Sequence, residues 1–577
     1  MKTTTFLLLA TIATFGCRSY PNYPVTEHST TFSDPAINAR LRGSAPAVNV
    51  DAARLRGARN EPQNWMTYYG AYDGQRFSAL DQINATNVAS LRPAWNFQFG
   101  PVGVMANPAT YSFEAAPIVV DGVMYVSGWD GYVWALDAAT GEMLWQYQQM
   151  IPIDTPLCCG NVNRGVAVAG GRVYFATQNG YVVALDAVTG KLVWQTAFAD
   201  VRAGESATMA PLVVKNMVIV GSSGAEYGVR GHIDALDLAT GARIWRRYAI
   251  PAKGEPGSET WNGDAWERGG GTAWITGTYD PDLDTLYWGT GNPGPVFDDQ
   301  PRRGSNLYTD CVLALNPNDG SIRWHFQFTP DDVWDYDGVN ENILFDQGGR
   351  RLLAHFDRNG YLFILDRTNG QPVRIQPFGM TTPTWGSIDA SGRVTSRLKP
   401  TKEGTAICPG PAGAKEWGHA AYNPRTGLLY APVIDACATF RLVPTPYREG
   451  MYYLGGEADA RGQVRGGAVR AINPATGAEA WTWRGKHPMV ASVLTTGGDL
   501  VFTGEPTGEF DAWDARSGAL LWQYQTGNGI HSNPVTYSVR GKQYIAVPTG
   551  WGGWLEGFAP ELIGAPRGSG LFVFALP

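Results

Sequence analysis

The sequence has few charged residues and no excess of basic ones. Among 577 residues, 45 Lys and Arg stand against 52 Asp and Glu, a formal net charge of −7, and charged residues make up only 17%. Nucleic acids and anionic membrane surfaces are bound through clustered basic side chains. The composition therefore argues against nucleic-acid partners and against electrostatic binding to membranes.

Long apolar runs are also missing downstream of the first residues, so no integral membrane contact is expected. The first residues themselves are typical of a secretory signal, because Lys2 precedes the short apolar stretch Phe6–Ala10. We predict a signal peptide over residues 1–17, with lipid attachment at Cys17 as an alternative, and a periplasmic location. Residues 18–60 are expected to be extended or poorly ordered, and residues 61–577 are expected to form the folded domain.

Cysteine is scarce as well. There are six cysteines and no C-x-x-C-H motif, so we expect no covalently attached c-type haem. Cys158 and Cys159 are adjacent, which is uncommon, and they are either two buried thiols in a loop or a vicinal disulfide. A bond between neighbouring cysteines closes a strained ring, which persists only where the surrounding structure enforces it.

Glycine, proline and tryptophan are abundant instead, with 71, 38 and 21 copies. Gly and Pro favour turns, and aromatic residues favour strands. This composition predicts a large all-β protein and argues against a helical bundle or a doubly wound nucleotide-binding fold.

One pattern, A-x-[DN]-x-x-x-G-x-x-x-W, recurs along the chain, with first steps of 49 and 51 residues. Each copy predicts two strands joined by a turn, in which Asp or Asn accepts backbone hydrogen bonds and Gly adopts a positive φ. Hairpins repeated at about 50 residues are typical of β-propellers, and the Trp is best explained by packing between neighbouring repeats. The copies begin at Ala135, Ala184, Ala235, Ala314, Ala471 and Ala512.

The repeats predict eight blades. Ile364 begins a seventh, degraded copy without the Trp, and the following step of 107 residues, to Ala471, is long enough for an unmarked repeat around Tyr422–Tyr430. Terminal strands usually close such rings, so we expect Leu91–Gln98 to pair with Ser569–Leu576. The expected fold class is therefore an all-β, eight-bladed β-propeller.

Five segments between the repeats carry the functional signal: Leu157–Gly165, Gly221–Gly231, Trp288–Pro295, Asp332–Asn340 and His355–Gly360. In this order they resemble the pyrroloquinoline quinone (PQQ)-dependent alcohol dehydrogenases, the methanol and ethanol dehydrogenase family. The resemblance covers nearly the whole mature chain. It implies oxidation of an alcohol to an aldehyde or ketone by hydride transfer to PQQ. Electrons would pass to an external acceptor such as a soluble cytochrome c, and a homodimer is left open.

The resemblance also implies which residues hold the cofactor. Cys158 and Cys159 match a vicinal disulfide against one face of PQQ, and Trp274 matches an aromatic residue stacked on the other face. Cys408 and Cys437 match a second, structural disulfide. The other residues implied to bind PQQ are Glu114, Arg164, Thr208, Ser223, Gly224, Ala225, Arg358 and Trp554.

The same resemblance places a metal ion at Glu226, Asn292 and Asp335, whose oxygen donors suit a hard cation. Asp335 is implied to be the catalytic base that takes the proton of the alcohol. Arg358 is implied to act with the metal at the reactive quinone carbonyl, where both favour developing negative charge.

Asp337 lies two residues after the implied base. Lanthanide-dependent members of the family carry a second Asp at this spacing, whereas calcium enzymes carry a small uncharged residue. On an extended segment both side chains would project to the same side and reach one ion, and an added carboxylate favours a trivalent cation. We therefore predict a lanthanide in the metal site, with Ca²⁺ as the runner-up. The structural alternative is that Asp337 caps the turn at Gly338.

Two positions depart from the family pattern. Val490 stands where a Trp is usual near the cofactor, and Asp435 is the nearest match to an Asn that contacts the quinone. Both changes affect the expected shape of the substrate pocket. The remaining functional alternatives are a PQQ-dependent sugar or polyol dehydrogenase and a non-catalytic propeller scaffold.

Overall fold

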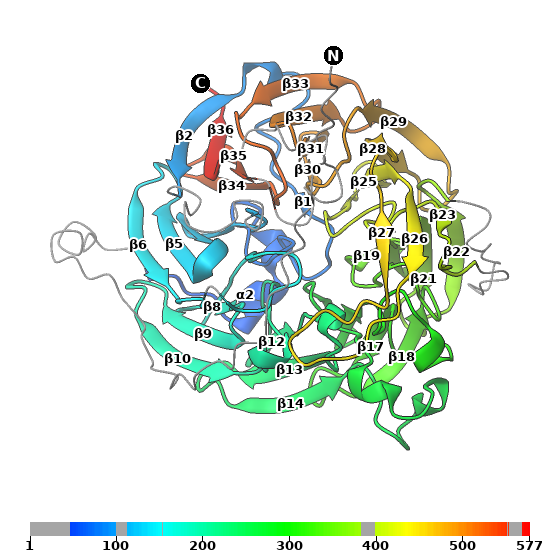
Figure 1. Cartoon of the computed structure of the whole chain (residues 1–577). Coiled ribbons are helices and arrows are strands. Elements are labelled where there is room, and N and C mark those ends of the chain that lie inside the picture. Colours follow the sequence, from blue (N-terminus) through cyan, green and yellow to red (C-terminus); the bar gives the residue numbers. More distant parts are fainter. Residues whose placement is uncertain (1–46, 100–111, 153, 382–397, 551, 553–567) are drawn as a thin grey trace, which may run out of the picture.

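Eight antiparallel sheets surround a central axis in the computed structural model, which describes residues 47–99, 112–152, 154–381, 398–550, 552 and 568–577 (Figure 1). Each sheet has four strands in antiparallel order, and one gains a short fifth strand. The predicted all-β, eight-bladed propeller is therefore confirmed. We number the blades 1 to 8 along the chain, starting with the sheet that begins at β3 (Ile118–Val120).

Blades 1 to 4 are each formed by four consecutive strands. Their strands are β3 (Ile118–Val120), β4 (Val123–Ser127), β5 (Tyr132–Asp137) and β6 (Met143–Gln148) in blade 1; β7 (Ala167–Ala169), β8 (Arg172–Ala176), β9 (Tyr181–Asp186) and β10 (Leu192–Ala197) in blade 2; β11 (Leu212–Val214), β12 (Met217–Gly221), β13 (His232–Asp237) and β14 (Arg243–Tyr248) in blade 3; and β15 (Thr278–Asp280), β16 (Thr285–Gly289), β17 (Cys311–Leu315) and β18 (Ile322–Gln327) in blade 4.

Blade 5 is also formed by four consecutive strands, whereas blades 6 to 8 combine strands that are not all consecutive. The strands are β19 (Ile343–Gln347), β20 (Arg350–Phe356), β21 (Tyr361–Asp366) and β22 (Pro372–Pro377) in blade 5; β24 (Ala421–Asn423), β25 (Leu428–Ala436), β28 (Val464–Ile472) and β29 (Glu479–Gly485) in blade 6; β1 (Phe77–Ser78), β30 (Leu494–Thr496), β31 (Leu500–Gly504), β32 (Glu509–Asp514) and β33 (Leu520–Gln525) in blade 7; and β2 (Arg92–Gln98), β34 (Val535–Val539), β35 (Lys542–Thr549) and β36 (Gly570–Ala575) in blade 8.

The repeat motif forms the outer hairpin of a blade, as the sequence predicted. In blade 1, the Asp137 carboxylate accepts hydrogen bonds from the backbone N–H groups of Ala139 and Thr140, both at 2.9 Å. Gly141 then closes the turn with a φ of 75°. The two strands β5 and β6 pair antiparallel on either side of this turn.

The motif tryptophan packs between blades, which confirms the predicted structural role. The indole of Trp145 lies against Gly190 in the next blade, where an added Cβ would meet the ring at 2.7 Å. Its Nε1–H donates to the Ala187 carbonyl at 3.0 Å. The other Trp–Gly contacts of this kind join Trp194 to Gly241, Trp245 to Gly320, Trp324 to Gly370, Trp481 to Gly518 and Trp95 to Gly141.

The ring is closed by its two ends. Strand β2 pairs antiparallel with β36, from Arg92 opposite Ala575 to Gln98 opposite Gly570, and Figure 1 shows the two strands side by side. This confirms the predicted pairing of Leu91–Gln98 with Ser569–Leu576. The eighth blade is this closing blade.

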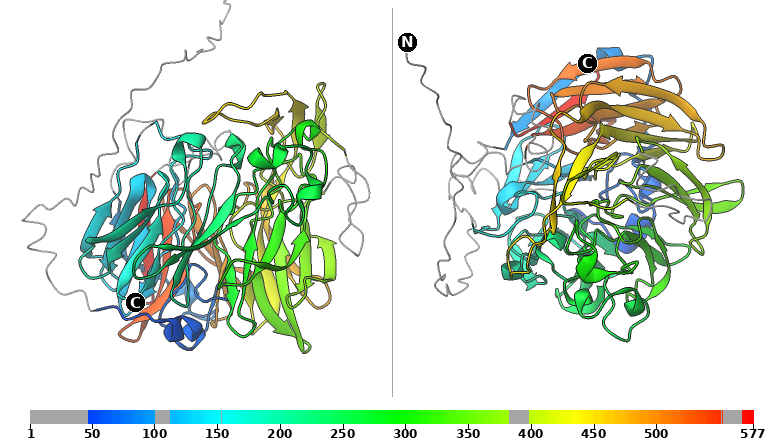
Figure 2. Two further views of the ribbon diagram at one scale, coloured as in Figure 1. Left: turned by 90° about the horizontal axis from the view of Figure 1, so that it is seen from below. Right: turned by 45° about the vertical axis from the view of Figure 1, so that its right-hand side comes forward.

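The unmarked repeat predicted around Tyr422–Tyr430 is wrong as a separate blade. This hairpin supplies β24 and β25 of blade 6, whose other two strands carry the motif that begins at Ala471. The extra length between the motifs is an insertion: β26 (Ala438–Leu442) and β27 (Gly456–Asp459) form a small sheet with β23 (Thr405–Ile407). Figure 2 shows the β26–β27 hairpin standing above one face of the ring.

Part of the N-terminal segment is ordered, contrary to the expectation for residues 18–60. Helix α2 (Ala52–Arg56) begins after Asp51, whose carboxylate accepts the Arg54 N–H at 2.8 Å. Leu55 is buried, so burial of an apolar side chain and a capped N-terminus fix this helix. Residues 1–46, which include the predicted signal and Cys17, lie outside the described residues.

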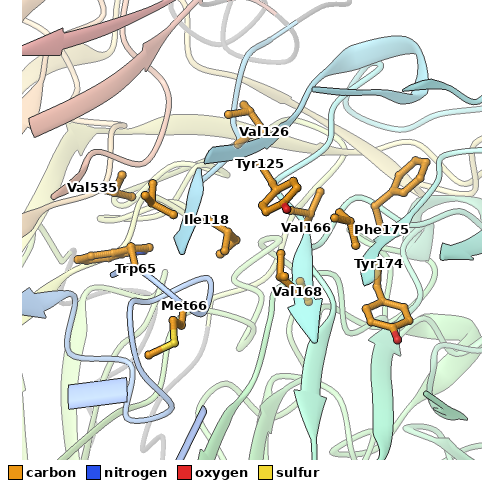
Figure 3. Close-up of a cluster of buried hydrophobic side chains, with 14 of the residues drawn as sticks. Trp65, Met66, Ile118, Tyr125, Val126, Val166, Val168, Tyr174, Phe175 and Val535 are labelled. Carbon is orange, nitrogen blue, oxygen red and sulfur yellow. The ribbon is translucent and has the colours of Figure 1, made fainter. Parts of the chain in front are cut away.

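The segment after α2 anchors the lower face of the ring. Trp65 and Met66 pack in the main hydrophobic cluster with Ile118 of blade 1 and Val535 of blade 8 (Figure 3).

In the part of the chain that the structure describes, every helix is too short or too polar to cross a membrane. Short 3-10 helices occur at η1 (Ala58–Asn60), η2 (Val88–Ser90), η4 (Trp129–Gly131), η5 (Val201–Ala203), η6 (Ala225–Tyr227), η7 (Ser258–Thr260), η8 (Ala265–Arg268) and η9 (Gln300–Arg302).

The Trp–Gly contact predicts a selective loss of stability. Gly241→Ala would place a methyl group 2.6 Å from the Trp194 ring, whereas Gly427, at a similar positive φ, has nothing within 4 Å of the added Cβ. We expect Gly241→Ala to unfold at a lower temperature than Gly427→Ala, because overpacking costs about 1–3 kcal/mol beyond the shared backbone strain. Thermal unfolding followed by circular dichroism measures the difference. Equal melting temperatures for the two variants would contradict the packing argument.

Candidate active site

A cavity of about 280 Å³ is lined by loops between and within blades 1 to 6. Its wall brings together segments far apart in the sequence. A concave site with a few convergent polar groups is the usual form of a small-molecule site. The predicted residues that line it are Cys158, Cys159, Arg164, Thr208, Ser223, Gly224, Glu226, Trp274, Asp335, Asp337 and Arg358.

Three predicted residues that the structure describes are not part of this wall. Glu114 is buried behind it and forms an ion pair with Arg164 at 2.8 Å. Asn292 is fully buried and contacts Asp337, and Ala225 is buried beside Glu226 at the start of η6. Trp554 lies outside the described residues.

Arg164 is held on several sides. Its guanidinium lies over the rings of Trp274 and Trp417, at 4.9 Å from each ring centroid, and its Nη1 donates to the Thr208 hydroxyl at 2.7 Å. Burial raises the pKa of its partner Glu114 to about 7, although the charge of Arg164 opposes the shift. A guanidinium and hydroxyl groups on one wall are suited to bind carboxylates.

The adjacent cysteines lie on the wall near a segment of the blade 6 insertion. Their sulfur atoms are 2.8 Å apart, which is longer than a disulfide bond, and the structure has them as two thiols. The Tyr452 hydroxyl donates to the Cys158 carbonyl at 2.8 Å, and its ring stacks on Tyr227. The vicinal disulfide thus stays a prediction, whereas the Cys408–Cys437 disulfide is confirmed.

The loop after blade 4 presents two aspartates to the cavity. The Asp332 carboxylate shapes this loop by accepting the N–H groups of Trp334 and Tyr336, at 3.0 and 2.9 Å. Asp335 has a φ of 70°, a left-handed conformation that is costly for a residue with a side chain and that clusters at functional sites. The segment is therefore not extended as expected, yet Asp335 and Asp337 both line the cavity.

Asp337 does not cap the turn at Gly338 in the way the structural alternative supposed. Its Oδ1 accepts the Asn292 N–H at 2.7 Å, and its Oδ2 accepts from Arg358 Nη1 at 2.5 Å. Gly291 leaves the space for this carboxylate, because an added Cβ would collide with Asp337 Oδ1. Arg358 Nη2 also lies 3.7 Å from the Asp335 carboxylate.

The residues fit a hard cation by their chemistry. Asn292 Oδ1 and Asp335 Oδ1 are buried oxygens that accept no hydrogen bond, so both have lone pairs left for a ligand. Among the described residues, however, no three carboxylate, imidazole or thiol side chains already converge as a metal cluster. Binding would therefore use the Asn292 amide together with the carboxylates.

Burial and like charges raise the pKa values of the acidic groups. Burial is the main cause for Asp335, whose pKa lies well above its usual range. The charges of Asp337 and Glu226 add to the shift and Arg358 opposes it. The pKa values of Asp337 and Glu226 are raised by burial too. Carboxylates crowded in this way favour a bound proton or a bound cation.

The comparisons with known proteins agree with this geometry. A family model described as PQQ glucose/ethanol/alcohol dehydrogenase, β-propeller domain, matches residues 65–376 and 467–545. The chain belongs to the PQQ-dependent alcohol dehydrogenase family. It is therefore a quinoprotein alcohol dehydrogenase, an oxidoreductase that uses PQQ to oxidise an alcohol.

Several relatives of this quinoprotein match over nearly their whole length. The quinoprotein alcohol dehydrogenase PedH of Pseudomonas putida is 38% identical over 573 residues, covering 93% of this chain and 95% of its own. A lanthanide-dependent methanol dehydrogenase of Methylacidiphilum fumariolicum is 39% identical, covering 92% and 91%. Among solved structures, a europium-containing methanol dehydrogenase superposes with a TM-score of 0.85 at 36% identity, covering 91% of this chain and all of its own.

The structure also shows cavity residues of the quinoprotein that no sequence motif indicated. Glu416 lines the cavity, with Oε1 3.6 Å from Arg358 Nη1, and Ala458 and Ala460 line it from the blade 6 insertion. Asp435, considered above as the quinone contact, lies on β25 instead, 3.5 Å from Arg484, and is not part of the wall. No sequence pattern marks Glu416, because its segment precedes β24 and carries no repeat or family motif.

Val490, the second residue that departs from the family pattern, is also not part of the cavity wall. Val490 packs in a buried cluster with Trp334 and Tyr336, the neighbours of the candidate base. It therefore contributes to the support of the loop that carries Asp335.

The cysteine pair gives a direct chemical prediction. We expect Cys158 and Cys159 to be oxidised in the protein purified in air, because their sulfurs are already adjacent in the structure. Alkylation under denaturing conditions without reductant, followed by mass spectrometry, should leave this pair unlabelled. The buried thiol of Cys311 serves as the control and should be labelled in the same sample. Two alkylated residues at positions 158 and 159 would contradict the prediction.

Proposed function

We propose that this quinoprotein oxidises its alcohol with a metal ion bound at Glu226, Asn292, Asp335 and Asp337, and with Asp335 as the catalytic base. The observation that carries the proposal is the buried, unpartnered Oδ1 of Asp335 on the cavity wall. The Oδ1 of Asn292, whose backbone N–H donates to Asp337, is buried and unpartnered as well. An oxygen with free lone pairs at this place can take a proton or bind a cation.

Different groups of lining residues have different roles in the reaction. Arg164, Thr208 and Ser223 would bind the carboxylates of the cofactor, and Trp274 would flank its plane opposite the cysteine pair. Bound PQQ supplies the quinone that accepts hydride from the alcohol. Asp335 takes the proton of the alcohol hydroxyl at its carboxylate. Arg358 stays oriented by its donation to the Pro411 carbonyl and favours negative charge that develops nearby.

Asp337 supports a lanthanide as the metal. The relatives include methanol dehydrogenases named as lanthanide-dependent and a structure named as europium-containing. An added carboxylate increases the attraction for a trivalent ion more than for a divalent one, and a trivalent ion is the stronger Lewis acid. Ca²⁺ is the second candidate.

An external carrier, such as a soluble cytochrome c, would accept the electrons, because the sequence has no motif for covalently attached haem. The protein would act in the periplasm, to which the predicted signal peptide would direct it, and a homodimer remains a proposal. A sugar or polyol as substrate is the alternative that a substrate panel decides.

The role of Asp335 can be tested by substitution. Asp335→Asn should lower dye-linked alcohol turnover by about 10²–10⁴-fold, since it removes the proton acceptor, while the melting temperature stays close to that of the wild type. Asp264→Asn, at an exposed position remote from the cavity wall, is the control and should turn over normally. Activity of Asp335→Asn within a few-fold of the wild type would remove Asp335 from the mechanism.

The metal can be tested by reconstitution. Metal-free protein supplied with PQQ should be far more active with La³⁺ or Ce³⁺ than with Ca²⁺, and Asp337→Ala should erase this preference because it removes the added carboxylate. Rates over a panel of alcohols and sugars measure both the metal and the substrate class. Full activity with Ca²⁺ and no increase in activity with lanthanides would contradict the proposal of a lanthanide.

A further inference from the structure

Glu416 is a carboxylate on the cavity wall that neither the repeat nor the family motifs account for. It lies in the segment before β24, and its side chain is only 7% exposed. One carboxylate oxygen, Oε2, accepts the backbone N–H of Trp417, which fixes the side chain. The other, Oε1, lies 3.6 Å from Arg358 Nη1.

Arg358 is thus shared by three carboxylates. Its guanidinium contacts Asp337 at 2.5 Å, Glu416 at 3.6 Å and Asp335 at 3.7 Å. A single positive charge does not balance three buried or partly buried negative charges. The excess of negative charge is what a cation in this cavity would neutralise.

A cation bound at Asp335 and Asp337 competes with Arg358 for both of them. Asp335 and Asp337 then share their negative charge between the cation and the guanidinium, and Glu416 is the acidic partner of Arg358 that the cation does not take. A buried charge without a partner is strongly destabilising. Arg358 is only 5% exposed, so loss of its acidic partners would destabilise the protein. Pairing with Glu416 avoids this loss.

We propose that Glu416 is a positioning residue that pairs with Arg358 when the metal ion takes Asp337, and that it thereby raises the affinity of the site for cations, for trivalent more than for divalent ions. This inference rests on the proposed metal site. The preference for trivalent ions follows because the energy between Glu416 and the ion scales with the charge of the ion.

The test is a metal titration that does not depend on turnover. Full-length mature protein loaded with PQQ and freed of metal is titrated with Eu³⁺, with lanthanide luminescence as the readout, and Ca²⁺ affinity is measured by competition. Glu416→Gln removes the charge but keeps the size and an oxygen for the Trp417 N–H. We expect its Kd for Eu³⁺ to rise by about tenfold or more, and its Kd for Ca²⁺ to rise less.

Three controls separate this role from a merely structural one. Glu416→Asp keeps the charge and should bind Eu³⁺ more tightly than Glu416→Gln does. Retention of PQQ after dialysis, measured by quinone absorbance, should not fall in Glu416→Gln, because losing a negative charge does not weaken an anionic cofactor. Glu505→Gln, at a similarly buried glutamate away from the cavity, should leave both affinities unchanged.

The outcomes are distinct. Unchanged Eu³⁺ affinity in Glu416→Gln, equal losses for Eu³⁺ and Ca²⁺, or a parallel loss of PQQ would each overturn the inference. A Glu416→Gln variant that fails to fold, together with a folded Glu416→Asp variant of much reduced Eu³⁺ affinity, would also count against it. Wild-type protein that binds neither ion would instead contradict the proposed metal site itself.

Discussion

Packing of a tryptophan from one blade on a glycine of the next is the contact on which the ring depends. The indole occupies the space that a Cβ would fill, as at Trp145 and Gly190, so each repeat fits against another repeat of the same kind. Where blade 5 lacks the tryptophan, Arg374 and Gln376 approach Gly477 instead. The pairing of the first and last strands then closes the ring, and a closed ring holds the loops on its face in fixed relative positions.

The fixed positions of the loops matter because the cavity wall is assembled from several separate loops. Cys158 follows blade 1, Glu226 belongs to blade 3, Asp335 follows blade 4 and Ala460 comes from the insertion in blade 6. Each segment contributes only part of the lining. The geometry of the site is therefore a property of the ring rather than of any single segment, and a site on such a scaffold can be precise although it is built on loops.

The cavity concentrates negative charge that the folded protein only partly balances. Burial and mutual repulsion raise the pKa values of Glu226, Asp335 and Asp337, and the nearest cation, Arg358, is divided among several carboxylates. Such an arrangement costs stability without a ligand. It becomes favourable when a cation is bound, which is the usual sign of a site kept for function rather than for folding.

The sequence by itself determined what is local and repeated: the turns at Asp137 and Gly141, the hairpins of the marked blades, and the motifs around Cys158 and Asp335. Only the tertiary structure decided that the hairpin at Tyr422 belongs to the same blade as Ala471, that Leu55 anchors an ordered helix, and that Glu416 rather than Asp435 faces the cavity. The reason is physical. A turn is fixed by interactions within about ten residues, whereas a cavity wall depends on which distant loops the closed ring brings together, and no periodicity in the sequence records that.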